Sequence, residues 1–154
     1  MTVQRKSATA MSERYAIVCA QFYPEIAQRL TVSAQARLVE AGCEPAECFE
    51  VPGAFELPAA AKLCAQSGRF KGVACLGAVI RGETDHYDYV CAETARGIQG
   101  VSLETGVPCS FGVLTVETME QALERSGGGV RDGGRNAAEA LLALEGLRAR
   151  LSDG

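Results

Sequence analysis

The chain has 154 residues, enough for one globular domain that buries a hydrophobic core without disulfides or a metal. Hydrophobic residues make up 47% and charged residues 22% of the chain, which excludes intrinsic disorder. The formal net charge of −4 argues against nucleic-acid binding, and no apolar run reaches the length of a membrane span. Seven cysteines without a C-x-x-C pair, beside a single histidine, argue against a zinc site.

The cysteines predict free thiols and a cytoplasmic location. Cys19, Cys75 and Cys109 each lie in a short apolar run, which is typical of a thiol buried in a strand. The first residues carry charges but no apolar segment of a secretory signal. Thiols persist in reducing compartments, so the chain is expected in the cytoplasm.

The first part of the chain predicts an arm, a strand and a helix. Residues 1–13 are polar and without period, so they are expected to form a flexible arm before one domain over residues 14–154. Tyr15–Ala20 (YAIVCA) is a short run of strand formers. A helix is expected over Pro24–Gly42, with the proline in its first turn and the glycine as its C-terminal cap. Its apolar face comprises Ile26, Leu30, Ala34 and Leu38.

Two further strands and a helix follow. A strand is expected at Glu47–Val51, before a turn at Pro52-Gly53. The helix over Phe55–Gln66 carries its proline early enough for it to be tolerated. Gly72–Ile80 (GVACLGAVI) is nearly all apolar, which is typical of a strand buried on both faces of a parallel sheet. A tight loop over residues 81–84 comes next.

The last third predicts one strand and three helices. A long helix is expected at Asp85–Thr105, a strand at Cys109–Thr115 and a helix at Glu117–Ser126. The glycine-rich stretch 127–134 then breaks the chain and joins two helices at an angle. The final helix, over Arg135–Leu151, has apolar residues at amphipathic spacing, namely Ala140, Leu144, Leu147 and Leu151.

The alternation of strands and helices predicts an α/β fold. Its sheet has four parallel strands with right-handed crossovers, and helices cover both faces. Ligands bind such sheets beyond the carboxyl ends of the strands. Four loops meet that description, at residues 21–23, 51–56, 78–86 and 116–117. Neither a P-loop nor a dinucleotide-binding glycine motif is present in the sequence.

The loop after the third strand carries the strongest chemical pattern. Gly82, Glu83 and Thr84 precede a helix, so backbone N–H groups and the helix dipole predict an anion site, above all for phosphate. An ordinary helix start, capped by Thr84 or Asp85, would give the same pattern. His86 lies in the first helical turn, where it is a candidate for proton transfer or a packing residue.

The other candidates carry two interpretations each. Phe22 follows the first strand, where its ring could stack on a heteroaromatic ligand or cover the core, and Phe55 and Phe111 share this ambiguity. Glu56 could accept hydrogen bonds from ligand hydroxyls or stabilise a helix start. Arg125 could bind a phosphate or only complement a helix end.

Three segments closely resemble those of lumazine synthases: residues 51–63 (VPGAFELPAAAKL), 76–90 (LGAVIRGETDHYDYV) and 106–125 (GVPCSFGVLTVETMEQALER). The match runs without a gap from Tyr15 to Arg125. The resemblance implies a flavodoxin-like, three-layer αβα fold with a four-stranded parallel sheet. It further implies homopentamers, with active sites between neighbouring subunits, and neither a metal nor a cofactor.

The resemblance also implies the reaction. The enzyme, 6,7-dimethyl-8-ribityllumazine synthase, condenses 5-amino-6-ribitylaminouracil with 3,4-dihydroxy-2-butanone 4-phosphate and releases phosphate and water. This transferase step is the penultimate one of riboflavin biosynthesis. Two alternatives are a carrier that holds a lumazine or flavin without turnover and the related enzyme that joins two lumazines. His86 and Arg125 favour the synthase over the carrier, and GETDHYDYV argues against the second enzyme.

Site roles follow from the same resemblance. His86 is the proton donor. The pyrimidine and its ribityl chain are expected on Phe22, Ala54, Phe55, Glu56, Ala78, Val79 and Ile80. The loop of Glu83 and Thr84 binds the sugar phosphate, while Phe111 and Arg125 reach the pyrimidine and the phosphate from the neighbouring subunit.

The chain departs from the family pattern at three places. Tyr23 stands where an asparagine is usual, and Glu83 where a small residue is common. Arg131 and Arg135 are expected to supply the positive charge of a family lysine. The loop over residues 127–134 is longer than in shell-forming members, which predicts pentamers, paired at most, and no icosahedral shell.

Overall fold

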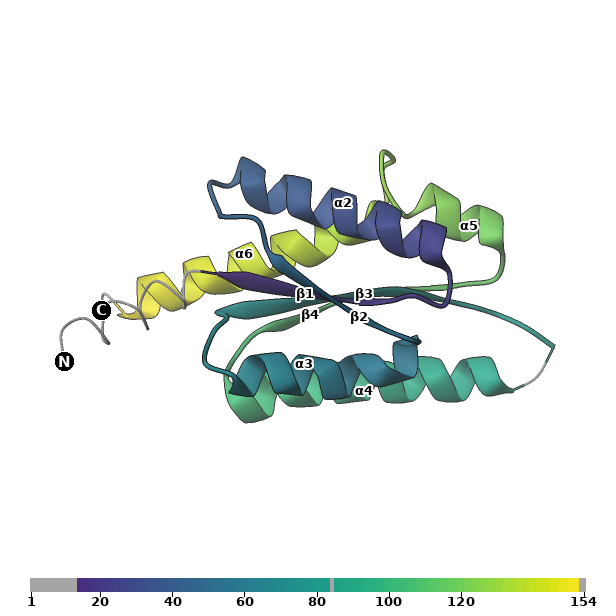
Figure 1. The fold of residues 1–154 in the computed structure, drawn as a ribbon, viewed down its shortest axis with the longest axis horizontal. Coiled ribbons are helices and arrows are strands. Elements are labelled where there is room, and N and C mark those ends of the chain that lie inside the picture. Colours follow the sequence, from purple (N-terminus) through teal and green to yellow (C-terminus); the bar gives the residue numbers. More distant parts are fainter. Residues whose placement is uncertain (1–13, 84, 153–154) are drawn as a thin grey trace.

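Four parallel strands form one sheet in the order β2-β1-β3-β4 (Figure 1). The structure, a computed structural model, describes residues 14–83 and 85–152, so the arm predicted over residues 1–13 lies outside the described residues. The strands are β1 Tyr15–Ala20, β2 Glu47–Val51, β3 Gly72–Ile80 and β4 Cys109–Val116. The first three have the predicted bounds, and β4 is one residue longer.

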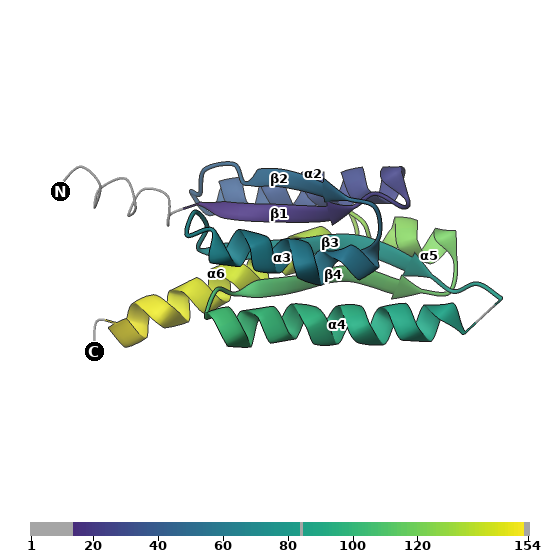
Figure 2. The ribbon, with the colours of Figure 1, turned by 60° about the horizontal axis from the view of Figure 1, so that its bottom comes forward.

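Helices cover both faces of the sheet, which confirms the three-layer arrangement. Helices α2, α5 and α6 lie on one face, and α3 and α4 run side by side on the other (Figures 1 and 2). Their bounds are α2 Pro24–Glu40, α3 Leu57–Gln66, α4 His86–Thr105, α5 Met119–Glu124 and α6 Gly133–Ser152. A 3-10 turn, η1 Ala54–Glu56, leads into α3. No described helix is long and apolar enough to cross a membrane.

Alternate residues of each buried strand face opposite layers, because successive side chains of a strand point to opposite faces. Ile17 of β1 packs in the core under α2 and α6, whereas Val18 packs in the core under α3 and α4. The predicted apolar face of α2 is buried throughout. Cys19, Cys75 and Cys109 are buried and all seven cysteines are free, which confirms the expected thiols. Burial raises the pKa of Cys109 to about 11.

Helix α6 begins two residues earlier than predicted, so the glycines 133 and 134 are helical. Asp132 caps the helix, since its Oδ1 accepts from the backbone N of Arg135 at 3.1 Å. A Cβ on Gly134 would lie 2.3 Å from the carbonyl oxygen of Leu30 in α2. Glycine therefore stands here because two helix backbones approach closely, and the prediction that residues 127–134 form the connection between two helices is wrong for Gly133 and Gly134.

The buried face of α6 also differs from the predicted apolar stripe. Gly134, Ala137, Ala138 and Leu141 are buried, whereas Ala140, Leu144, Leu147 and Leu151 are exposed. For the three leucines the physical reason is visible in Figure 1, where the C-terminal half of α6 runs past the end of the sheet. Ala140 lies in the first half of α6 but on its exposed face. Only the first half of α6 therefore packs against the described strands.

Candidate functional site

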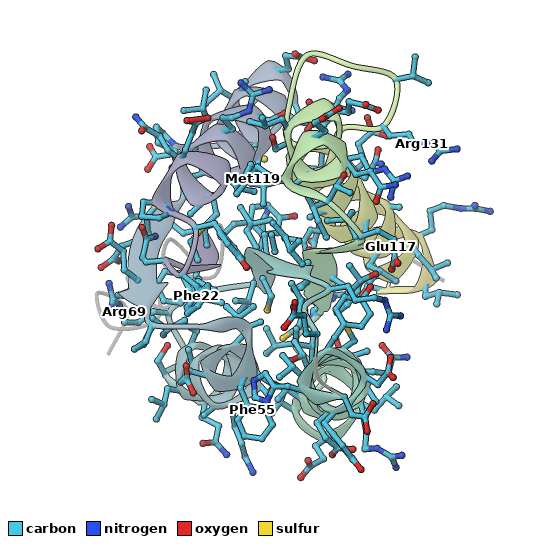
Figure 3. All side chains as sticks on the ribbon, turned by 90° about the vertical axis from the view of Figure 1, so that its right-hand side faces the viewer. Phe22, Phe55, Arg69, Glu117, Met119 and Arg131 are labelled. Atoms are coloured by element: carbon cyan, nitrogen blue, oxygen red, sulfur yellow. The ribbon has the colours of Figure 1, made fainter. Side chains whose placement is uncertain are left out.

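A cavity of about 480 Å³ opens at the carboxyl ends of the strands. Figure 3 looks onto this end of the molecule and labels Phe22 and Phe55, two of the residues that line the cavity. The cavity is lined by eight residues predicted from the sequence, namely Phe22, Ala54, Phe55, Glu56, Ala78, Val79, Ile80 and His86. It is also lined by Tyr23 and Gly53, which lie in predicted ligand loops but were assigned no binding role, and by Tyr89 and Val90, which the sequence did not indicate.

The two phenylalanines at this cavity are exposed at the surface. Phe22 is 70% exposed and Phe55 is 59% exposed, so neither covers the core. The half-buried Tyr23 packs on the core and meets the ring of Phe22 edge to face, with centroids 4.9 Å apart. The interpretation of Phe22 as a core residue is therefore wrong.

The turn after β2 is fixed by its own hydrogen bonds. The carboxylate of Glu56 accepts from the backbone N of Gly53 at 2.9 Å, so its structural role at the turn is confirmed. The carbonyl of the buried Ala54 accepts from Thr94 Oγ1 of α4 at 3.3 Å. These bonds hold the turn rigidly against α4, and they place the exposed Phe55 and Glu56 at the cavity.

His86 is the first residue of α4 and is exposed at the cavity. Asp85 occupies the N-cap position, but its side chain makes no capping hydrogen bond. The backbone amides of this first turn are thus oriented for an anion, with the dipole of a 20-residue helix behind them. Glu83 is exposed but does not line the cavity, and Thr84 lies outside the described residues.

Arg81 makes structural contacts near the site that the sequence did not reveal, because its partners lie elsewhere in the chain. Its Nε donates to Glu117 at 2.8 Å, and its guanidinium lies 3.7 Å from Asp88 and 4.3 Å over the ring of Tyr87. Its backbone N donates to Val116 O at 2.9 Å. The bond to Glu117 raises the pKa of Arg81. Arg81 thereby connects the ends of β3 and β4 to the first turn of α4.

Two predicted residues lie away from this cavity. Phe111 is half-exposed on the edge strand β4. Arg125 ends α5 and lines a second cavity of about 300 Å³, together with Glu124, Val130 and Arg131. Figure 3 shows Arg131 on the other side of the sheet end from Phe22. Within one chain the structure therefore separates the phosphate-binding candidate from the aromatic cavity.

Of the two arginines expected to replace the family lysine, only Arg131 is at the second cavity. Arg135 forms ion pairs with Glu40 at 3.3 Å and Glu139 at 3.1 Å.

Among the described residues, no cluster of three or more histidine, cysteine or acidic side chains could hold a metal ion.

A parallel α/β fold with a ligand-sized cavity at the carboxyl ends of its strands is typical of proteins that bind or transform small molecules. The family model of 6,7-dimethyl-8-ribityllumazine synthase matches residues 12–148, so the chain belongs to that family. A relative of that name from Syntrophus aciditrophicus (strain SB) is 44% identical over 146 residues, 94% of each chain. Another from Desulfatibacillum aliphaticivorans is 45% identical over 89% of this chain and 88% of its own. A third from Desulfosudis oleivorans is 43% identical over 90% of each chain.

Proposed function

We propose that this chain is a 6,7-dimethyl-8-ribityllumazine synthase of riboflavin biosynthesis. The family membership supports this reaction over the enzyme that joins two lumazines, and the presence of His86 and Arg125 supports turnover over a lumazine carrier. The main structural support for this function is that residues from three strand-end loops line one cavity. That cavity, about 480 Å³, lies within the usual range for a small-molecule site.

The pyrimidine is proposed to lie between Phe22 and the end of β3. The exposed ring of Phe22 offers a stacking face, and stacking of a base on an aromatic ring contributes about 1–3 kcal/mol. Residues 78–80 line the same cavity, and their backbone groups are proposed to hydrogen-bond the ring edge. Glu56 keeps one oxygen on Gly53, and its other oxygen is proposed to accept from the ribityl hydroxyls.

The chemistry proceeds by addition and elimination at carbonyl carbon. An amine of the pyrimidine attacks the ketone of the sugar phosphate, and loss of water gives an imine. Removal of a proton from the adjacent, hydroxyl-bearing carbon then expels phosphate with its bonding electron pair and leaves an enol, which tautomerises to a new carbonyl. The second amine attacks the remaining carbonyl, and loss of a second water closes the ring. The loss of phosphate oxidises the hydroxyl-bearing carbon to a carbonyl and reduces the phosphate-bearing carbon to a methyl group, so the sequence needs no external oxidant.

His86 is proposed to move protons in these steps. It lies at the cavity and at the N-terminus of α4, where the phosphate of the second substrate would be held by backbone amides. A positioned acid or base contributes about 10²–10⁴-fold to such a reaction. Alignment of the two substrates supplies a further barrier reduction of up to about 7–11 kcal/mol.

The active site is proposed to be completed by a neighbouring subunit in a pentamer. The exposed Phe111 and the cavity of Arg125 are separate from the aromatic cavity within one chain, which supports their use by a neighbour. Mixing His86→Ala with Arg125→Ala protein after reversible dissociation tests this. Mixed oligomers then contain some intact sites, so activity should return. Failure to regain activity in verified mixed oligomers would contradict the shared site.

Two further proposals concern assembly and location. The glycine-rich loop between α5 and α6 would displace any contact between pentamers, so discrete pentamers or pairs of them are proposed in place of shells. Electron microscopy tests this, and uniform hollow spheres would contradict it. Seven free thiols support a cytoplasmic location, which fractionation of the producing cells would test.

The activity itself is tested by mixing the purified protein with both substrates. The product lumazine absorbs and fluoresces, so its formation can be followed directly together with phosphate release. We expect catalytic turnover, with one phosphate released for each lumazine formed. A protein that carries a yellow ligand but gives no turnover would be the carrier instead.

A further inference from the structure

Helix α2 holds the segment before the glycine-rich loop, although the two are about ninety residues apart in the chain. Arg29 Nε donates to Ser126 Oγ at 2.8 Å, and Arg29 Nη2 donates to the carbonyl of Leu123 at 3.0 Å. Ser126 is fully buried, and its hydroxyl donates to the same Leu123 carbonyl at 3.1 Å. The guanidinium of Arg29 therefore forms hydrogen bonds to the chain on both sides of Arg125.

Helix α2 also holds the segment after the loop. Ser33 Oγ donates to the carboxylate of the buried Asp132, the residue that caps α6. The backbone N of Gly133 donates to the carbonyl of Arg125 at 2.8 Å, which ties the two ends of the loop together. Gly134 lies directly against the α2 backbone. Both ends of the loop are thus fixed on α2.

The intervening residues 127–131 have little reason to hold one conformation by themselves. Gly127 and Gly128 adopt positive φ angles of 138° and 79°, and glycine loses more conformational freedom on ordering than any other residue. Arg125 and Arg131 line the same cavity with one acidic residue, Glu124, so the cavity keeps a net positive charge and the two guanidinium groups repel when no anion lies between them. The contacts with α2 therefore oppose both the entropy of the loop and the repulsion of the arginines.

We propose that Arg29 is a positioning residue for Arg125. By holding Leu123 and Ser126, it presents Arg125 and Arg131 in advance as an anion site for the phosphate of the sugar substrate. This rests on the proposed function, in which Arg125 binds that phosphate. A site ordered beforehand binds more tightly, because less ordering cost falls on the binding step.

The test compares Arg29→Ala, Arg29→Lys and Ser126→Ala with a matched control, Arg37→Ala. Arg37 is another arginine of α2, but it pairs with Glu40 and Glu139 and not with the loop. For each protein we would measure kcat, the KM of both substrates, the inhibition constant of inorganic phosphate and the thermal midpoint.

Arg29→Ala should raise the KM of the sugar phosphate and the inhibition constant of phosphate about five- to tenfold, as expected for partly exposed charge-assisted hydrogen bonds. The KM of the pyrimidine should stay within about twofold of wild type. Arg29→Lys keeps the charge but not the forked donor, so it should recover only part of the loss. Ser126→Ala should weaken phosphate binding with no change of charge, and Arg37→Ala should resemble wild type.

Three outcomes would overturn the proposal. Equal increases in both KM values would mean general structural damage, and full recovery by Arg29→Lys would mean that only the charge matters. Unchanged phosphate inhibition in both Arg29→Ala and Ser126→Ala would mean that α2 does not position the loop. Absence of turnover in the wild-type protein would instead refute the proposed function.

Discussion

Replacing Phe22 with alanine should weaken pyrimidine binding strongly while changing stability little. Truncation of a fully buried phenylalanine costs about 3–5 kcal/mol of unfolding free energy. Phe22 is 70% exposed, so roughly a third of that cost, about 1 kcal/mol, is expected. Loss of ring stacking contributes about 1–3 kcal/mol to the binding free energy, which corresponds to an affinity for the pyrimidine roughly 5- to 150-fold lower.

Fluorescence titration with the pyrimidine substrate alone would give the affinity, and urea unfolding would give the stability. Phe70→Ala is the matched control, because Phe70 is 5% exposed and precedes β3 at the opposite end of the sheet. It should lose several kcal/mol of stability, about 3–5 for a buried phenylalanine, and keep its affinity for the pyrimidine. If Phe22→Ala instead lost stability like Phe70→Ala, or bound the pyrimidine like wild type, the ring would not be a ligand platform.

Four further substitutions test separate parts of the account. His86→Ala should lower kcat and leave pyrimidine affinity nearly unchanged, and an unchanged kcat would remove the proposed proton-transfer role. Arg125→Ala should raise the KM of the sugar phosphate, and the increase should correspond to a loss of about 1.5–3 kcal/mol of binding free energy. Equal effects on both substrates would point to damaged assembly. Gly134→Ala should destabilise by about 1–3 kcal/mol in urea unfolding because its Cβ has no room, whereas Gly146→Ala, with nothing within 4 Å, should be neutral or stabilising. Burial raises the pKa of Cys109 from 9.0 to about 11, so the native state favours the protonated thiol. The stability that this thiol contributes is fully present below pH 9, and it is lost as pH rises toward 11. Between pH 8 and 10.5, wild type should therefore lose roughly 2 kcal/mol more stability than Cys109→Ala, and parallel pH profiles would contradict this.

The sheet was predictable because its signals are local. Short, nearly continuous apolar runs are typical of strands buried on both faces, and β1 and β3 have the bounds that such runs indicate. The edge strand β2, which has no fully buried residue, also has its predicted bounds. The start of α6 was not predictable in the same way. Gly134 looks like a helix breaker in sequence, but it is required where α6 approaches the backbone of α2. That requirement depends on a contact about a hundred residues away.

The exposed leucines of α6 illustrate another limit of periodicity. Apolar spacing indicates a face of a helix, but not how far the underlying sheet extends. Leu144, Leu147 and Leu151 have the expected spacing, yet they lie on the part of α6 that runs beyond the strands. Helix propensity and apolar periodicity carry no information on how far the sheet extends under the helix.

The cavity was largely predictable because parallel strands bring their carboxyl ends together. Three loops that are distant in sequence therefore had to meet, and residues from each line the cavity. Arg81 and Arg29 were not predictable, since their roles depend on Glu117, Leu123 and Ser126. Neither sequence spacing nor local pattern indicates such contacts.

The most direct test of the account is a crystal structure with an unreactive, ribityl-bearing pyrimidine analogue and inorganic phosphate. The account predicts the pyrimidine ring on Phe22 and the ribityl chain at Glu56. It also predicts phosphate between the first turn of α4 and the neighbouring subunit's Arg125. Binding of the pyrimidine outside the carboxyl-end cavity, or a phosphate site without Arg125, would contradict it.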